Sequence, residues 1–105
     1  MKSKSLSFLD GFRIVLRNSR SQAAEMVLPP GHSVGGPDNR HPASDQWLYV
    51  VSGHGEAVVG NKIIPLSTQT LVLIEQGEGH EIRNMGKDTL RTVSFYVPPA
   101  YRNGD

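Results

Sequence analysis

The stretch Asn39-Arg-His-Pro-Ala-Ser-Asp-Gln-Trp-Leu-Tyr-Val-Val-Ser-Gly53 joins a polar loop to the most strand-like run of the chain. Side chains of a strand alternate between its two faces, which divides this run into two sets. The sets are Gln46, Leu48 and Val50 on one face and Trp47, Tyr49 and Val51 on the other. Both sets are largely apolar, so the pattern predicts a strand buried on two sides.

Similar short runs of β-forming residues recur on both sides of this stretch, separated by turns rich in Gly, Pro, Asn and Asp. They are residues 12–17, 23–28, 56–59, 62–64, 70–74, 80–84 and 90–97. Residues 29–46 contain four prolines and three glycines, too many for a helix interior, and predict an ordered loop. No segment has convincing helical periodicity. The sequence therefore predicts an all-β fold, either a small antiparallel β-barrel or a sandwich.

Composition narrows the class of protein. The length of 105 residues predicts a single domain over residues 1–105, and 37% hydrophobic with 20% charged residues is ordinary for a soluble globular chain. A net charge of +1 without a block of Lys or Arg argues against nucleic-acid binding. There is no apolar run long enough to span a membrane, and the first residues lack the apolar stretch of a secretory signal. The absence of cysteine excludes disulfides and thiolate metal sites, and we expect a cytoplasmic protein.

A second polar turn, Glu75-Gln-Gly-Glu-Gly-His80, leads into a strand that carries His80, Ile82 and Asn84 on one face. We interpret this turn and the loop around His41 as two halves of one pocket. A lone histidine in a strand is more often structural than a ligand, and the placement of two of them in paired polar turns favours a shared role.

These two stretches resemble the paired motifs of the cupin superfamily, which are small β-barrels of the jelly-roll type. The positions that match are His41, Gly53, Gly77, His80 and Asn84. The resemblance covers about residues 24–97 and implies a jelly-roll barrel with its pocket inside. The chain departs from the family pattern where Gln46 stands in place of Glu and Asn39 in place of the first His.

The resemblance implies a divalent metal ion, such as zinc, iron, manganese or nickel, held by His41, Gln46, His80 and Asn39. Imidazole nitrogens are good donors, whereas an amide oxygen is weaker than a carboxylate. Such a ligand set carries no charge, so we expect the ion to be held weakly. The facial triad of non-haem iron oxygenases needs a carboxylate, and strand alternation points Asp45 and Glu81 away from the pocket.

Three functions remain open at this stage. In the first, the chain is a metal-binding cupin with a small polar organic ligand, and it acts as a dioxygenase or isomerase if it is an enzyme. Alternatively, it binds a small molecule without chemistry and has a degenerate metal site, which the replacements at Gln46 and Asn39 favour. The third alternative is a structural domain whose pocket is filled by side chains. No catalytic residue or substrate is assigned.

Two further expectations concern structure. We expect Asn84 to order the turn before Gly86 rather than to bind a ligand. We also expect a homodimer, because a chain this short has a modest core and the strands within residues 12–28 would expose unpaired ladder groups. Trp47 and Tyr49 offer aromatic area for the same contact.

Overall fold

The computed structural model describes residues 1–36 and 41–101. Within these ranges the chain forms nine strands and no helix, which confirms the predicted all-β class. The strands are β1 Gly11–Arg17, β2 Gln22–Leu28, β3 Ser33–Gly36, β4 Asp45–Ser52, β5 Gly55–Val59, β6 Lys62–Leu66, β7 Leu71–Ile74, β8 His80–Arg83 and β9 Leu90–Val97. Over the same ranges, no helix is long and apolar enough to cross a membrane.

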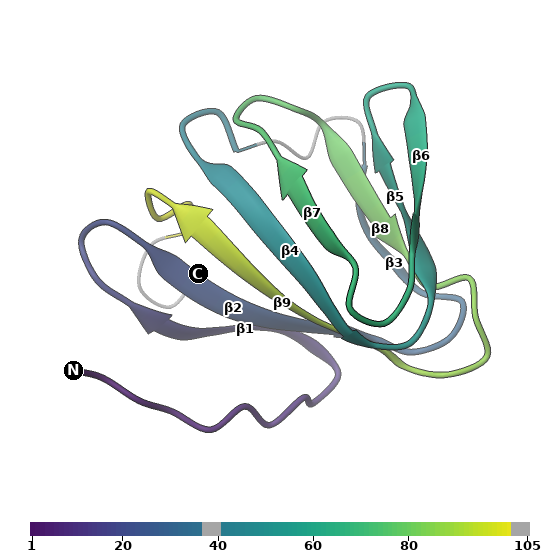
Figure 1. The fold of residues 1–105 in the computed structure, drawn as a ribbon, viewed down its shortest axis with the longest axis horizontal. Coiled ribbons are helices and arrows are strands. Elements are labelled where there is room, and N and C mark those ends of the chain that lie inside the picture. Colours follow the sequence, from purple (N-terminus) through teal and green to yellow (C-terminus); the bar gives the residue numbers. More distant parts are fainter. Residues whose placement is uncertain (37–40, 102–105) are drawn as a thin grey trace.

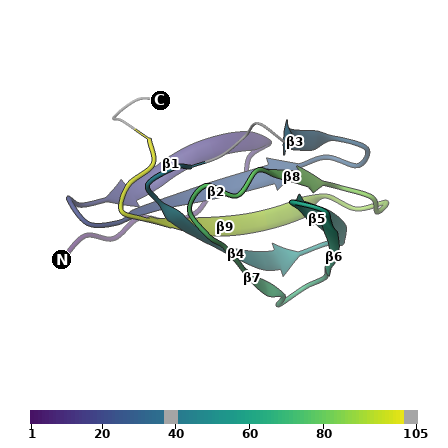
Figure 2. The ribbon, with the colours of Figure 1, turned by 90° about the horizontal axis from the view of Figure 1, so that it is seen from above.

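The strands form two sheets in which every pairing is antiparallel. The larger sheet has the order β1-β2-β9-β4-β7 and the smaller sheet β3-β8-β5-β6 (Figure 1). Figure 2, seen from above, shows β1, β2, β9, β4 and β7 following one another across the larger sheet. Because non-consecutive strands become neighbours, residues far apart in sequence meet on the inner faces.

The core lies between the inner faces of the two sheets. From the larger sheet, Leu48 and Val50 of β4 are almost completely buried, and from the smaller sheet Ala57 and Ile82 meet them in the same apolar cluster. The cluster follows from the alternation of β4, because Leu48 and Val50 lie on the buried face of the strand. Burial of apolar side chains at about 25 cal/mol per Å² is the main stabilising term in such a fold.

The outer face of β4 corrects the expectation that this strand is buried on two sides. Trp47 remains 40% exposed in the single chain, and its cross-strand neighbours Leu73 and Phe95 are exposed as well. The smaller sheet covers only the inner face of the larger one, so the outer side chains of β4 have no second layer above them. An apolar surface therefore remains open across β7, β4 and β9.

Strand β3 lies inside the segment for which the sequence predicted only a loop. Its four residues pair with β8, from Ser33 opposite Arg83 to Gly36 opposite His80. The residues of β3 are mostly exposed and rich in glycine, so their composition carries no strand signal. Pairing with β8 supplies the order instead. Asn39, a predicted ligand, lies outside the described residues.

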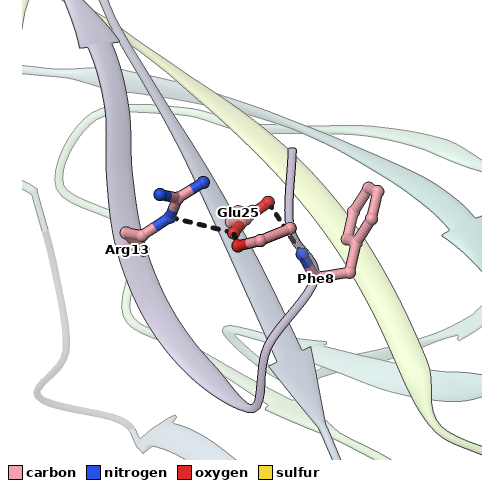
Figure 3. Close-up of polar contacts among 4 residues, drawn as sticks. Phe8, Arg13 and Glu25 are labelled. Carbon is pink, nitrogen blue, oxygen red and sulfur yellow. Dashed lines mark hydrogen bonds and ion pairs between the residues drawn. The ribbon is translucent and has the colours of Figure 1, made fainter. Parts of the chain in front are cut away.

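The N-terminal segment is fixed to the outer side of the larger sheet by one carboxylate. Glu25 of β2 is 1% exposed and accepts hydrogen bonds from Ser7 Oγ at 2.9 Å, the Phe8 backbone N–H at 3.3 Å and Arg13 Nε at 3.0 Å. Figure 3 shows Phe8 from the N-terminal segment and Arg13 from β1 converging on Glu25. Burial acts to raise the pKa of the carboxyl, but these hydrogen bonds and the charge of Arg13 outweigh it and hold the pKa below its ordinary 4.5.

Replacing Glu25 by Gln should therefore lower the free energy of unfolding at pH 7 by about 2 kcal/mol, because an amide nitrogen would face hydrogen-bond donors. The folded-state pKa of Glu25 is depressed, so its contribution is complete above the unfolded pKa and is lost as the pH falls through the folded value. Urea unfolding from pH 7 downwards should show this loss in the parent and less of it in Glu25→Gln. The matched control is Glu56→Gln, a partly exposed carboxylate. Parallel pH curves for the parent and Glu25→Gln would contradict the assignment.

Candidate functional site

The pocket lies between the sheets at the end of the barrel where the inner face becomes polar. In the larger sheet, Gln22 of β2, Tyr96 of β9 and Gln46 of β4 stand side by side in one cross-strand row. All three are buried. From the smaller sheet, His80 at the start of β8 faces the same space, and His41 enters from the loop before β4.

Backbone hydrogen bonds join the two loops that carry the histidines. The carbonyl oxygen of His41 accepts from the N–H of Gly77 at 3.1 Å, and the Asp45 carboxylate accepts from the N–H of Gln76 at 3.1 Å. Gly77 has a φ of +82°, a conformation that favours glycine. A glycine suits this position of the second motif because the turn must bring the N–H of Gly77 to the carbonyl oxygen of His41 in the first motif. The predicted pairing of the two halves is thus seen in the contacts of the backbone.

The two imidazole rings lie together, with ring centroids 5.3 Å apart. Burial lowers the pKa of His41, and the neighbouring His80 lowers it further. Burial also lowers the pKa of His80, although the carbonyl and charge of Glu78 act in the opposite direction. Both rings are therefore neutral at pH 7. His80 Nδ1 lies 3.3 Å from the Glu78 carbonyl oxygen, and in the tautomer that donates this bond Nε2 carries the lone pair.

Gln46 has one satisfied and one unsatisfied amide atom. Its Nε2 donates to Ser94 Oγ at 3.1 Å. Its Oε1 is buried without a hydrogen-bond partner, and the side chain lines the same cavity as His41 and His80. A buried acceptor without a partner is uncommon, and it leaves an oxygen lone pair available beside the two imidazoles. The structure thus brings together three of the four predicted ligands.

Three aromatic residues that sequence reasoning did not assign to the site complete the cavity: Phe12, Tyr96 and Tyr101. With them in place the cavity has a volume of about 40 Å³. That volume admits a water molecule or an ion and excludes a typical organic ligand, whose pockets measure roughly 300–1,000 Å³. Burial raises the pKa of both Tyr96 and Tyr101, so the two phenols stay protonated at pH 7. The alternation of β9 could have revealed Tyr96 as inward-facing, whereas nothing local marks Tyr101.

The other residues considered from the sequence have structural roles. Asn84 donates from Nδ2 to the carbonyl oxygens of Leu28 and Asp88 and accepts from the Gly86 N–H, so it orders the turn as predicted. Glu81 pairs with Arg83 at 2.7 Å, away from the pocket. Among the described residues, no group of three or more His, Cys, Asp or Glu side chains is placed to hold a metal ion. Among the described residues, the metal donors that line this cavity are the two imidazoles and the amide oxygen of Gln46.

A wider depression of about 460 Å³ lies elsewhere, between the N-terminal segment and the β1–β2 turn. Its lining includes Leu16, Ala23 and Phe95 but no histidine or carboxylate. The histidines and Gln46, which could bind a metal or ligand, line the small cavity instead. We therefore assign the candidate site to this cavity although the cavity is small.

Comparison with known proteins agrees with the geometry. Residues 24–96 match the family model of the cupin domain. The chain is 28% identical over 82 residues to the oxalate-binding protein of Thermotoga maritima, covering 78% of this chain and 66% of that protein. It is 32% identical over 72 residues to the tetracenomycin polyketide synthase protein TcmJ of Streptomyces glaucescens, covering 69% of this chain and 46% of that protein. The chain thus spans between about half and two thirds of the length of these relatives.

A crystal structure of a Bacillus halodurans protein superposes with a TM-score of 0.85 at 26% identity, covering 91% of this chain and 76% of that one. Together with the family match, this confirms the predicted jelly-roll fold, which in this chain consists of two antiparallel sheets.

The proximity of the two imidazoles gives a prediction for the metal-free protein. Replacing His80 by Gln should raise the pKa of His41 toward its ordinary 6.5, because one of the two causes of the depression is removed while burial remains. Nuclear magnetic resonance titration of the imidazole C–H signals in the presence of EDTA would measure both values. Since the unfolded chain takes up these protons more readily, the parent should lose stability as the pH falls below 6.5. An unchanged His41 titration in His80→Gln would show that the rings do not interact.

Proposed function

Since the chain belongs to the cupin family, we propose that its pocket binds a divalent metal ion through His41, Gln46 and His80. The observation that carries the proposal is the buried Oε1 of Gln46, which has no hydrogen-bond partner and shares its cavity with two neutral imidazoles. Neutral imidazole and an amide oxygen suit ions of intermediate hardness, such as zinc, iron, manganese or nickel. Asn39 remains part of the proposal as a fourth ligand on the strength of the sequence alone. A bound ion would supply Lewis acidity to an oxygen atom of a ligand.

The donor set favours binding over oxygen activation. The two imidazoles and the amide leave the charge of a divalent ion uncompensated, and the nearby carboxylates of Asp45 and Glu81 are engaged elsewhere. An iron centre that activates oxygen needs a carboxylate ligand. We therefore rank a non-catalytic, small-molecule-binding cupin with a weak metal site above a dioxygenase or isomerase. The likeness to an oxalate-binding protein supports a small polar organic molecule as the ligand class.

The metal proposal is tested by changing the charge of one ligand. Replacing Gln46 by Glu should tighten binding of a divalent ion by about tenfold, or about 1.4 kcal/mol, because a carboxylate offsets charge of the ion. Replacing His80 by Ala should abolish binding without loss of the β fold. Elemental analysis after dialysis and isothermal titration calorimetry with zinc or manganese would measure both, with circular dichroism as the check on folding.

The matched control is His54→Ala, which removes a histidine from a turn outside the pocket and should leave the affinity unchanged. Donor distances of about 2.0–2.3 Å to one ion in a metal-loaded crystal would support the assignment directly. Equal affinities for Gln46→Glu and the parent would mean that Gln46 does not face the ion, and the proposal would fail.

We also propose that the chain forms a homodimer through the outer face of the larger sheet. The sequence predicted that the strands within residues 12–28 would pair with a second copy through their open edges. In the structure β2 is paired on both sides, so of these two strands only β1 keeps an open edge. The exposed row of Leu73, Trp47 and Phe95 offers a continuous apolar surface instead. Large exposed apolar patches commonly mark contacts between proteins, and a second copy presents the same surface.

Replacing Leu73 by Lys should convert the dimer to a monomer, because the charge would be buried without a partner at the interface. Light scattering at micromolar concentration should give twice the 11.5 kDa chain mass for the parent and the single-chain mass for the variant. Ile63→Lys, which changes an exposed apolar residue of β6 on the other sheet, is the control and should stay dimeric. A parent mass near 11.5 kDa would exclude this dimer.

A further inference from the structure

We propose that Tyr101 is a displaceable plug of the pocket, and that the space its ring fills is the binding subsite for a monocyclic phenol. This inference deepens the proposed function, because it names the class of organic molecule that enters the same cavity. It rests on the surroundings of the Tyr101 ring and on the way its backbone is attached.

The ring of Tyr101 is surrounded by three other rings of the pocket. Its centroid lies 5.0 Å from that of Phe12, 5.4 Å from that of His41 and 5.2 Å from that of Tyr96. The contacts with His41 and Tyr96 are edge-to-face and that with Phe12 is tilted, which are favourable geometries for aromatic pairs. Any planar aromatic ring of this size would make the same contacts.

The Tyr101 ring also lies beside the buried phenol of Tyr96, whose hydroxyl group can donate or accept a hydrogen bond. Among the described residues, those that line the cavity include no Lys, Arg, Asp or Glu. A neutral ring that carries one hydroxyl group fits these surroundings, whereas a carboxylate would find no cationic side chain among the described lining residues. The subsite therefore favours a phenol over an aromatic acid.

Tyr101 belongs to neither sheet. In Figure 2 the segment after β9 (yellow) leaves the larger sheet and passes toward β1. Its backbone is held by one side chain of β2: Gln22 Oε1 accepts from the N–H groups of Ala100 and Tyr101 at 3.1 and 3.0 Å, and Gln22 Nε2 donates to the Tyr101 carbonyl at 2.8 Å. Arg17 Nη1 donates to the same carbonyl at 3.0 Å. None of these bonds is part of a strand ladder, so the segment can leave without breaking a pairing of the sheets.

The volume of the cavity gives the reason for displacement. About 40 Å³ remains while the Tyr101 ring is in place, enough for an ion or water but not for a ring. An apolar protein cavity of roughly 150 Å³ binds benzene, and vacating the ring would open space of that order. An organic ligand thus reaches the histidines only where Tyr101 has moved out, and a phenol replaces the ring contacts that the plug gives up but not its backbone hydrogen bonds to Gln22 and Arg17.

The test uses metal-free protein and p-cresol, the side chain of tyrosine as a free molecule. In Tyr101→Ala, calorimetry should show p-cresol binding at least tenfold tighter than in the parent, because the plug no longer competes. In the parent at saturating p-cresol, the Tyr101 ring signals should move toward those of an exposed tyrosine, and the amides of Ala100 and Tyr101 should lose protection from hydrogen exchange. Gln22→Ala loosens the attachment but keeps the ring, and it should also bind p-cresol more tightly than the parent.

Several outcomes would overturn the proposal. The first is that a folded Tyr101→Ala or Gln22→Ala variant does not bind p-cresol. The second is that the Tyr101 ring stays in place in the parent saturated with p-cresol. The third is that Tyr101→Ala gains as much affinity for oxalate as for p-cresol. Phe8→Ala removes an aromatic ring outside the pocket and should create no p-cresol site. Because no metal is present, a negative result here leaves the metal proposal standing, and failure of metal binding leaves this one standing.

Discussion

The antiparallel pairing of β4 with β9 is the constraint on which most of the molecule depends. It sets Gln46 opposite Tyr96 and Leu48 opposite Ser94, and a shift by one residue would exchange the inner and outer faces of β4. With this register the inner face is apolar around Leu48 and polar at the end that contains Gln46. The same pairing that builds the core therefore also decides at which end of the barrel the pocket opens.

Among the described residues, the charged side chains are arranged so that none of them lines the pocket. The carboxylate of Glu25 is fully buried, but on the outer side of the larger sheet, where it holds the N-terminal segment. Asp45 and Glu81 stand next to inward positions in sequence and use their oxygens for a turn and for an ion pair. Inside, burial keeps the imidazoles and phenols uncharged. An interior of this kind stabilises a cation only through dipoles and lone pairs, which explains why we expect weak metal binding.

The sequence predicted those parts of the fold and site that depend on local pattern. Alternation located the long strands, and the resemblance to the paired cupin motifs pointed to His41, Gln46 and His80. The position of Asn84 before Gly86 indicated its role in the turn. The sequence did not predict β3, whose order comes from pairing with β8, nor the exposure of Trp47, which depends on how far the second sheet reaches. Tyr101 was missed because it follows two prolines outside any strand, and contacts with residues distant in sequence, among them Gln22 and Arg17, bring it to the pocket.

Two buried glutamines in one row of the larger sheet differ in the number of hydrogen bonds that their amide groups make. Gln22 and Gln46 flank Tyr96 and are equally buried, yet both amide atoms of Gln22 are bonded to the C-terminal segment, whereas Gln46 is bonded through Nε2 alone. A buried acceptor without a partner costs about 1–3 kcal/mol. The cavity beside Gln46 has room for a water molecule or an ion, and either would give this oxygen a partner. A metal ion beside the two histidines would satisfy that oxygen, and it would do so without disturbing the bond to Ser94.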